Sequence, residues 1–277
     1  AGAATPDHRT TGPQDHGSAR AAAPQHAARD SLTSDETEDK IAVGSRARER
    51  VASLLNAQVN AKAKGAKVLA IANVIGSAIP RMADATFYTH AGPEIGVAST
   101  KCFTTQLANL LMLAIWLGRR RGTLSLSEGT RLVDGLARIP QLMQESLGGT
   151  RQLVQSIAKR TMEARDVLFL GRGLSYPIAL EGALKLKEIS YVHAEGYAAG
   201  EMKHGPIALI DSHVPVIVLL PKDSHYERSF SNLQEAKARE GRVIAIASYG
   251  DEDARGASDD VVEIPSVDEE PTPFLTG

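Results

Sequence analysis

The chain has little of what several common classes of site require. It contains one cysteine, Cys102, in 277 residues. No internal disulfide can therefore form, and a reducing, cytoplasmic setting is expected. Aromatic residues make up only 4% of the chain, and its formal net charge is −2. We therefore expect neither a strongly basic nucleic-acid binder nor an aromatic stacking surface for single strands.

Long apolar runs are also missing. The longest candidate, Leu107 to Leu117, precedes three arginines at 119–121 and falls short of the roughly 18 apolar residues that a membrane span requires. The first residues lack the apolar segment of a signal peptide. We expect no membrane contact and no signal peptide in this sequence.

Residues 1–40 differ in composition from the rest. They show no periodicity, and Leu32 is their only large aliphatic residue. Such a segment cannot bury enough apolar surface to offset its ordering entropy, so we expect it to be disordered. Its histidines are widely and irregularly spaced, which favours solvated side chains over metal ligands.

The remaining sequence alternates apolar runs with helical periodicity, which predicts an α/β fold with parallel sheets. Strands are expected at 68–72, 83–90, 167–170, 214–220, 243–247 and 261–264, and helices at 41–63, 94–121, 123–163, 178–189 and 226–240. This order favours two tandem doubly wound domains. The first, residues 41–122, is incomplete, and the second, residues 123–277, begins with its leading helices.

Most residues capable of acid–base chemistry lie in one stretch, 166–211. Its first apolar run ends at Gly171-Arg172-Gly173, a turn typical of phosphate-binding units but weak evidence by itself. On the next predicted helix Lys185 and Glu188 share a face, because they are three residues apart. A second cluster contains His193, Glu195, Glu201, Lys203 and His204.

Each of these residues has a functional and an ordinary interpretation. Glu188 could move a proton between adjacent sugar carbons, but an exposed ion pair with Lys185 is the commoner arrangement. His204 could open a sugar ring or be a packed histidine before a glycine. Ser99 could bind an anion near a helix start, or simply cap the helix. The second cluster lacks the HExxH spacing, so no metal site is expected.

Three segments resemble the isomerase half of the glutamine–fructose-6-phosphate aminotransferase family, also called glucosamine-6-phosphate synthases. They are 61–80 (AKAKGAKVLAIANVIGSAIP), 96–107 (GVASTKCFTTQL) and 179–210 (ALEGALKLKEISYVHAEGYAAGEMKHGPIALI). The resemblance runs from about residue 60 to 265 and implies tandem flavodoxin-like sugar-isomerase domains in a homodimer. It also implies conversion of fructose 6-phosphate and ammonia to glucosamine 6-phosphate, and we expect no cofactor.

The resemblance also implies roles for individual residues. Glu188 matches the family's proton-transfer glutamate, and Lys185 matches the lysine beside it. His204 matches the ring-opening histidine, which acts on the neighbouring subunit's site, and Ser99 matches a residue that lines the sugar pocket. Residues 32–37 (LTSDET) resemble an eroded phosphate loop, which makes Ser34 and Thr37 candidate phosphate ligands. In that loop Asp35 replaces a glycine and places negative charge against a phosphate.

Two parts of the family pattern have no counterpart in the sequence: the glutaminase half with its N-terminal cysteine, and the C-terminal tail with its Schiff-base lysine. We therefore expect a truncated isomerase part with weak or no amination of its own. Two alternatives remain open at this point. One is a non-catalytic sugar-phosphate-binding or dimerisation module, and the other is aldose–ketose phosphate isomerisation without ammonia.

Overall fold

The computed structural model describes residues 51–277. The expected disorder of residues 1–40 and the candidate phosphate ligands Ser34 and Thr37 lie outside the described residues. Residues 54–277 form one compact unit, and residues 51–63 are helical. Within the described range, no helix is long and apolar enough to cross a membrane.

The first sheet consists of two short parallel strands. Strand β1 (Leu69–Ala72) pairs with β2 (Ala85–Tyr88), and the short helix α2 (Ala78–Met82) connects them. Both strands confirm the sequence prediction. Asn73 directly follows β1, and the loop 89–99 directly follows β2. Both therefore lie at the carboxyl end of this sheet, where parallel α/β folds bind ligands.

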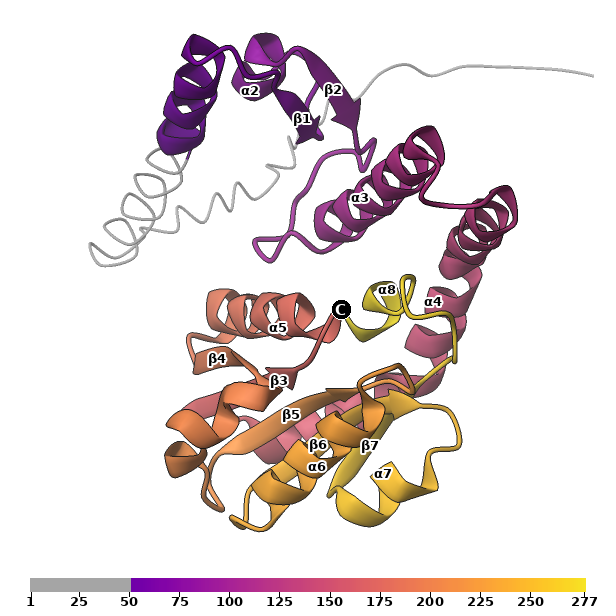
Figure 1. The fold of residues 1–277 in the computed structure, drawn as a ribbon. Helices are drawn as coiled ribbons and strands as arrows, with labels where there is room; N and C mark the ends of the chain where they lie inside the picture. Colours follow the sequence, from indigo (N-terminus) through magenta and orange to yellow (C-terminus); the bar gives the residue numbers. More distant parts are fainter. Residues whose placement is uncertain (1–50) are drawn as a thin grey trace, which may run out of the picture. The chain divides into compact units, whose positions relative to one another are not determined.

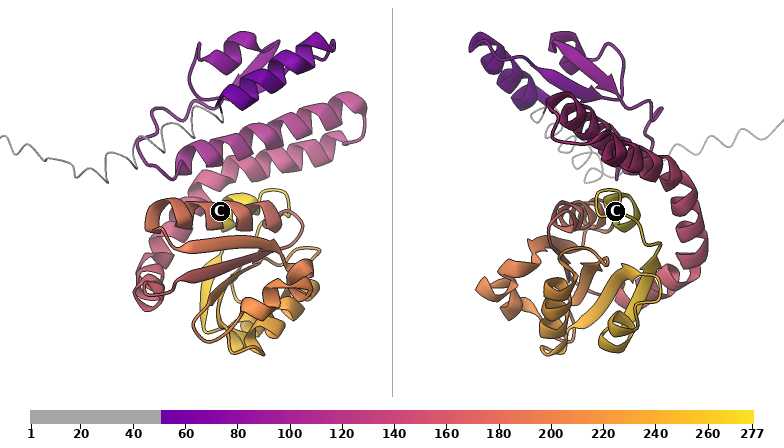
Figure 2. Two further views of the ribbon diagram at one scale, coloured as in Figure 1. Left: turned by 90° about the vertical axis from the view of Figure 1, so that its left-hand side faces the viewer. Right: turned by 45° about the vertical axis from the view of Figure 1, so that its right-hand side comes forward.

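Two long helices follow this sheet. Helix α3 (Thr100–Arg121) packs beside α4 (Leu126–Thr161), as Figure 2 shows. Ser125 and Glu128 form a capping box at the start of α4, which begins slightly later than the helix predicted at 123–163. Helix α4 is curved in Figure 2. Pro140 lies inside this helix, and a proline in a helix removes one backbone hydrogen bond and favours a bend.

The predicted start of α3 at Glu94 is wrong. The helix begins at Thr100, and Ser99 before it has a φ of 55°, in the left-handed region that ends regular helix geometry. Glu94 does not continue the helix toward the N-terminus. Its Oε2 instead accepts a hydrogen bond from the backbone N–H of Cys102 at 3.2 Å, as a capping side chain would.

The second sheet has five parallel strands in the order β4-β3-β5-β6-β7, drawn in Figure 1. Their bounds are β3 (Asp166–Gly171), β4 (His193–Ala198), β5 (Pro215–Leu220), β6 (Arg242–Ser248) and β7 (Asp260–Ile264). This order is that of a flavodoxin-like sheet, which confirms the predicted fold class. Strand β4 was not predicted, because its sequence HAEGYA carries a histidine, a glutamate and a glycine instead of an apolar run.

Both faces of the second sheet are covered. Leu168 and Leu170 pack in one core cluster together with residues of α6 (Tyr226–Lys237) and α7 (Glu252–Ala257). Val167 and Phe169 pack in another, together with residues of α5 (Ser175–Ser190). Burial on both faces explains why β3 reads as a continuous apolar run and not as an alternation.

The connection after β4 positions the second half of the central stretch. Two 3₁₀ helices, η1 (Ala199–His204) and η2 (Pro206–Leu209), lead from β4 to β5. At the end of the chain, α8 (Pro273–Thr276) buries Phe274 and Leu275 in a cluster with Ile139 of α4.

We expect alanine at Gly196 to destabilise the protein. A Cβ atom there would lie 2.7 Å from Leu180 Cα and 2.8 Å from Ala179 O. Both atoms belong to the backbone of α5, so the free energy of unfolding should fall by about 1–3 kcal/mol. Urea denaturation measures this change.

The matched control is Gly149→Ala in α4, where a Cβ would meet nothing within 4 Å. It should raise stability by roughly 0.5–1 kcal/mol, because alanine favours helix over glycine. Equal stabilities of Gly196→Ala and wild type would contradict the close packing of β4 on α5.

Candidate functional site

The candidate site is built on the loop 89–99, which joins β2 to α3. Its backbone enters the left-handed region at His90 (φ 51°), Gly92 (φ 72°) and Ser99 (φ 55°). Residues other than glycine adopt this conformation at a cost in free energy, and such strained residues collect at functional sites. The loop therefore needs contacts that hold it in place.

Glu94 and Cys102 form one of these contacts. Burial raises the pKa of the Glu94 carboxyl, but the hydrogen bonds from Cys102 outweigh it and leave that pKa below its ordinary value. Burial, followed by the contact with Glu94, raises the pKa of the Cys102 thiol. Cys102 is also buried. It is therefore a core residue and not a nucleophile, as the sequence predicted.

Lys185 of α5 holds the other end of the loop. Its Nζ donates hydrogen bonds to Ala98 O at 2.6 Å, to Glu181 Oε1 at 2.6 Å and, more weakly, to Ser99 O at 3.5 Å. The side chains of Lys185 and Glu181 are only 18% and 25% exposed. We call these contacts the Lys185 clamp. They join α5 to the loop that carries Ser99, across a sequence separation of 87 residues.

Glu188 shares a face of α5 with this clamp, because Glu181, Lys185 and Glu188 recur at helical spacing. The interpretation of Lys185 and Glu188 as an ion pair is wrong. Lys185 pairs with Glu181, one turn before it, and not with Glu188. Glu188 is exposed, and within residues 51–277 its carboxylate forms neither a hydrogen bond nor an ion pair. It is thus open to a ligand.

His204 lies at the end of η1 and is exposed. In the part of the chain that the structure describes, no hydrogen bond or ion pair joins it to Glu188 or Lys185. The structure therefore brings Ser99 and α5 together, but it does not bring the imidazole of His204 into contact with them inside one chain.

The second cluster does not form a site. His193 begins β4, and its Nδ1 lies 2.7 Å from Asp166 Oδ1 at the amino end of the sheet. The hydrogen bond with Asp166 raises the pKa of His193 above its ordinary value. Lys203 pairs instead with Glu235 of α6 at 2.8 Å. Among residues 51–277, no group of three or more potential ligands could hold a metal ion.

The turn after β3 is occupied by protein side chains. Arg172 Nη1 donates to Asn232 Oδ1 at 3.3 Å. Gly173 has a φ of 56°, and a Cβ there would lie 2.3 Å from the ring of His225. The glycine is therefore required for close packing. Phosphate binding by this turn stays a prediction.

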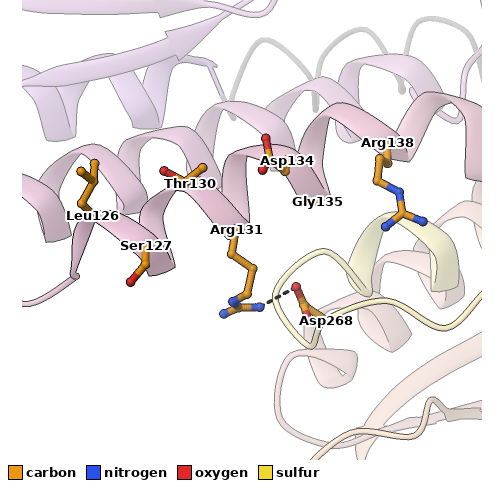
Figure 3. A pocket seen from close by; sticks show the side chains of 8 residues that line it. All are labelled: Leu126, Ser127, Thr130, Arg131, Asp134, Gly135, Arg138 and Asp268. Atoms are coloured by element: carbon orange, nitrogen blue, oxygen red, sulfur yellow. Dashed lines mark ion pairs between the residues drawn. The ribbon is translucent and has the colours of Figure 1, made fainter.

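A cavity of about 890 Å³ lies along α4, and none of the predicted site residues between 51 and 277 lines it. Figure 3 shows Arg131 of α4 directed toward Asp268. Their ion pair measures 2.5 Å, and Glu270 lies 3.7 Å from the same guanidinium. These side chains are between 42% and 47% exposed, so the pairs add little stability. They tie the segment before α8 to α4.

Comparison with known proteins gives consistent matches. The sequence profile of the SIS domain matches residues 19–116 and 162–276. The glutamine–fructose-6-phosphate aminotransferase (isomerizing) of Thermus thermophilus is 54% identical over 207 residues, which are 75% of this chain and 34% of the relative. The one from Aquifex aeolicus is 51% identical over 217 residues, 78% of this chain and 35% of the relative. The chain thus spans about a third of the length of these curated relatives.

A solved structure agrees with these matches. The C-terminal domain of glucosamine-fructose-6-phosphate aminotransferase from Francisella tularensis superposes with a TM-score of 0.76 at 37% identity. The superposition covers 79% of this chain and 62% of that domain.

Sequence reasoning missed Glu181, Glu94 and Asn73, which hold the loop. Glu181 had a readable signal, because it lies four residues before Lys185 on the same helix. Glu94 was assigned to the helix that it in fact caps. Asn73 had none, since an asparagine after a short strand is common in turns.

We expect Lys185→Met to destabilise the protein. Methionine keeps the apolar stem but removes the ammonium, so the Glu181 carboxylate and the Ala98 carbonyl lose their partner. The free energy of unfolding should fall by about 1.5–3 kcal/mol, the usual range for hydrogen bonds to charged groups. Urea denaturation measures this.

The control is Lys187→Met, an identical change at an exposed position of α5, which should have little effect. If both variants unfold at the wild-type urea concentration, the Lys185 clamp contributes nothing to stability.

Proposed function

This chain belongs to the SIS-domain family, and on that premise we propose that it acts as the sugar-isomerase part of a glucosamine-6-phosphate synthase. The proposed ligands are fructose 6-phosphate and glucosamine 6-phosphate. The Lys185 clamp carries the proposal, because it joins the loop of Ser99 to the helix of Glu188. Ser99 lines the proposed sugar pocket. Ser34 and Thr37, outside the described residues, are the proposed phosphate ligands.

The proposed chemistry is proton transfer between adjacent carbons. The carboxylate of Glu188 removes a proton from C1 of the open-chain ketose and returns it to C2, through an ene-diol or its amine counterpart. The exposure of Glu188 supports this role, since no protein cation occupies its oxygens among the described residues. The three N–H donors of Lys185 already have acceptors, so Lys185 holds the loop rather than the sugar.

We propose that the site is completed in a cytoplasmic homodimer. Several large apolar side chains near the site are exposed: Ile95 93%, Val97 77%, Ile189 65% and Tyr191 90%. Apolar groups gathered in this way are typical of a covered surface. In the proposed dimer, His204 of one subunit opens the sugar ring in its neighbour's site. The lack of a contact between His204 and Glu188 inside one chain is consistent with this division.

Deuterium incorporation tests the role of Glu188 without any amine donor. In deuterated water, fructose 6-phosphate gains deuterium at C1 only if a base removes that proton. We expect exchange with the wild type and its loss by about 100-fold or more in Glu188→Gln, within the range of general-base contributions. Mass spectrometry of the recovered sugar phosphate gives the rate.

The control is Glu227→Gln, an identical change at an exposed position of α6, which should exchange at the wild-type rate. Saturable binding of fructose 6-phosphate by the wild type without any exchange would favour the non-catalytic binding module. Glucosamine 6-phosphate formed on adding ammonium would extend the activity to amination, whereas glucose 6-phosphate alone would indicate simple isomerisation.

Mixed dimers test whether subunits share the site. Glu188→Gln and His204→Asn should each be inactive alone. A one-to-one mixture of the two, unfolded and refolded together, should regain roughly a quarter of wild-type activity, because half of the dimers then hold one site with both native residues. Glucose 6-phosphate formation measures the recovery. Two variants that stay inactive when mixed would place His204 and Glu188 in the same subunit's site.

A further inference from the structure

The side chain of Asn73 connects three elements at the carboxyl end of the first sheet. Asn73 follows the last residue of β1. Its Nδ2 donates a hydrogen bond to Gly92 O at 2.6 Å and contacts Cys102 Sγ, in the first turn of α3, at 3.7 Å. Its Oδ1 accepts hydrogen bonds from Thr89 Oγ1 at 2.9 Å and from the backbone N–H of Ala91 at 3.0 Å.

These contacts use the whole hydrogen-bonding capacity of the amide. An asparagine side chain has two N–H donors and two acceptor positions on its oxygen. Here both donors face acceptors, a carbonyl oxygen and a sulfur, and both acceptor positions face donors, a hydroxyl and an amide. In the reverse orientation the amide N–H groups would face the N–H of Ala91, and the amide oxygen would face Gly92 O. The partners therefore fix how the side chain lies.

The bonds of Asn73 bracket the strained part of the loop. His90, with a φ of 51°, lies between the two residues that donate to Oδ1, and Gly92, with a φ of 72°, accepts from Nδ2. A left-handed residue other than glycine costs on the order of 1 kcal/mol or more. Hydrogen bonds on both sides of His90 offset this cost and determine the direction in which the chain leaves β2.

The far end of the loop is held independently. Glu94 accepts a hydrogen bond from the backbone N–H of Cys102 in the first turn of α3. Lys185 donates hydrogen bonds to the carbonyl oxygens of Ala98 and Ser99. Without Asn73, the described segment between β2 and Glu94 would keep the hydrogen bond from the Thr89 backbone N–H to Ala72 O, at 3.0 Å. The position of Ser99 therefore depends on fixation at both ends, and Asn73 supplies the first.

We propose that Asn73 is a positioning residue of the sugar-phosphate site. It sets the path of the loop 89–99 and so the place of Ser99, and it does not touch the sugar, because all its polar positions are engaged within the protein. This inference rests on the proposed function, and it deepens that function by naming what holds the binding loop.

The test compares Asn73→Asp with the wild type. Aspartate has the same shape and keeps both acceptor bonds, but it loses both donors and sets a negative charge against Gly92 O and Cys102 Sγ. Hydrogen–deuterium exchange of the loop peptide should accelerate about tenfold or more, with peptides from the five-stranded sheet unchanged. Calorimetry should show fructose 6-phosphate affinity weakened by a similar factor.

Two substitutions at Thr89 provide the matched controls. Thr89→Val keeps the shape and removes one of the four contacts, so it should shift loop exchange and affinity in the same direction but by less. Thr89→Ser keeps the hydroxyl and should behave like the wild type in both measurements. A global loss of stability would instead accelerate exchange in all peptides.

The outcomes separate this inference from the proposed function. Wild-type protein that binds no sugar phosphate overturns the proposed function, and the role of Asn73 in a sugar site with it. Wild-type protein that binds, together with an Asn73→Asp variant of unchanged affinity and loop exchange, overturns the assignment of Asn73 alone.

Discussion

The candidate site depends on the hydrogen bonds that one ammonium group makes to two backbone carbonyls and one carboxylate. Lys185 belongs to a helix of the five-stranded sheet, whereas Ala98 and Ser99 belong to the loop of the two-stranded sheet. Withdrawing a lysine from water is costly unless its donors find partners, and Glu181 supplies the countercharge. The arrangement therefore forms only when helix and loop meet at the right distance, and it places Glu188 on a helix face adjoining that loop.

Most of the fold could be predicted from the sequence, because parallel strands that are buried on both faces appear in it as continuous apolar runs. The runs at 167–170, 214–220 and 243–247 are apolar throughout since both sheet faces are covered. No sequence pattern indicates the Lys185 clamp. Its acceptors on the loop are backbone carbonyls, which every residue possesses, and its ends are 87 residues apart. Only the resemblance to a known family placed Ser99 and Lys185 in one site.

The separation of His193 from His204, which are close in sequence, has a simple geometric cause. Residues 193–204 are close in sequence but cross the sheet, because β4 separates His193 from the 3₁₀ helix that ends at His204. A six-residue strand spans roughly 20 Å, so its two ends lie at opposite edges of a parallel sheet. His193 therefore pairs with Asp166 at the amino edge, while His204 follows the carboxyl edge, where ligands bind in this class of fold.

The polar side chains near the site fall into two groups: those that hold the loop 89–99 and those that stay exposed. The loop 89–99 contains two residues other than glycine in the left-handed region, and no regular element fixes its course. Side chains from three places hold it: Asn73 after β1, Glu94 within the loop, and Lys185 on α5. Each of these side chains forms its hydrogen bonds with other protein atoms. Glu188 and His204 are exposed instead, and we propose that they act on the ligand. Whether a polar side chain near this site binds the ligand or supports the loop is therefore better predicted from its hydrogen bonds within the protein than from its chemical type.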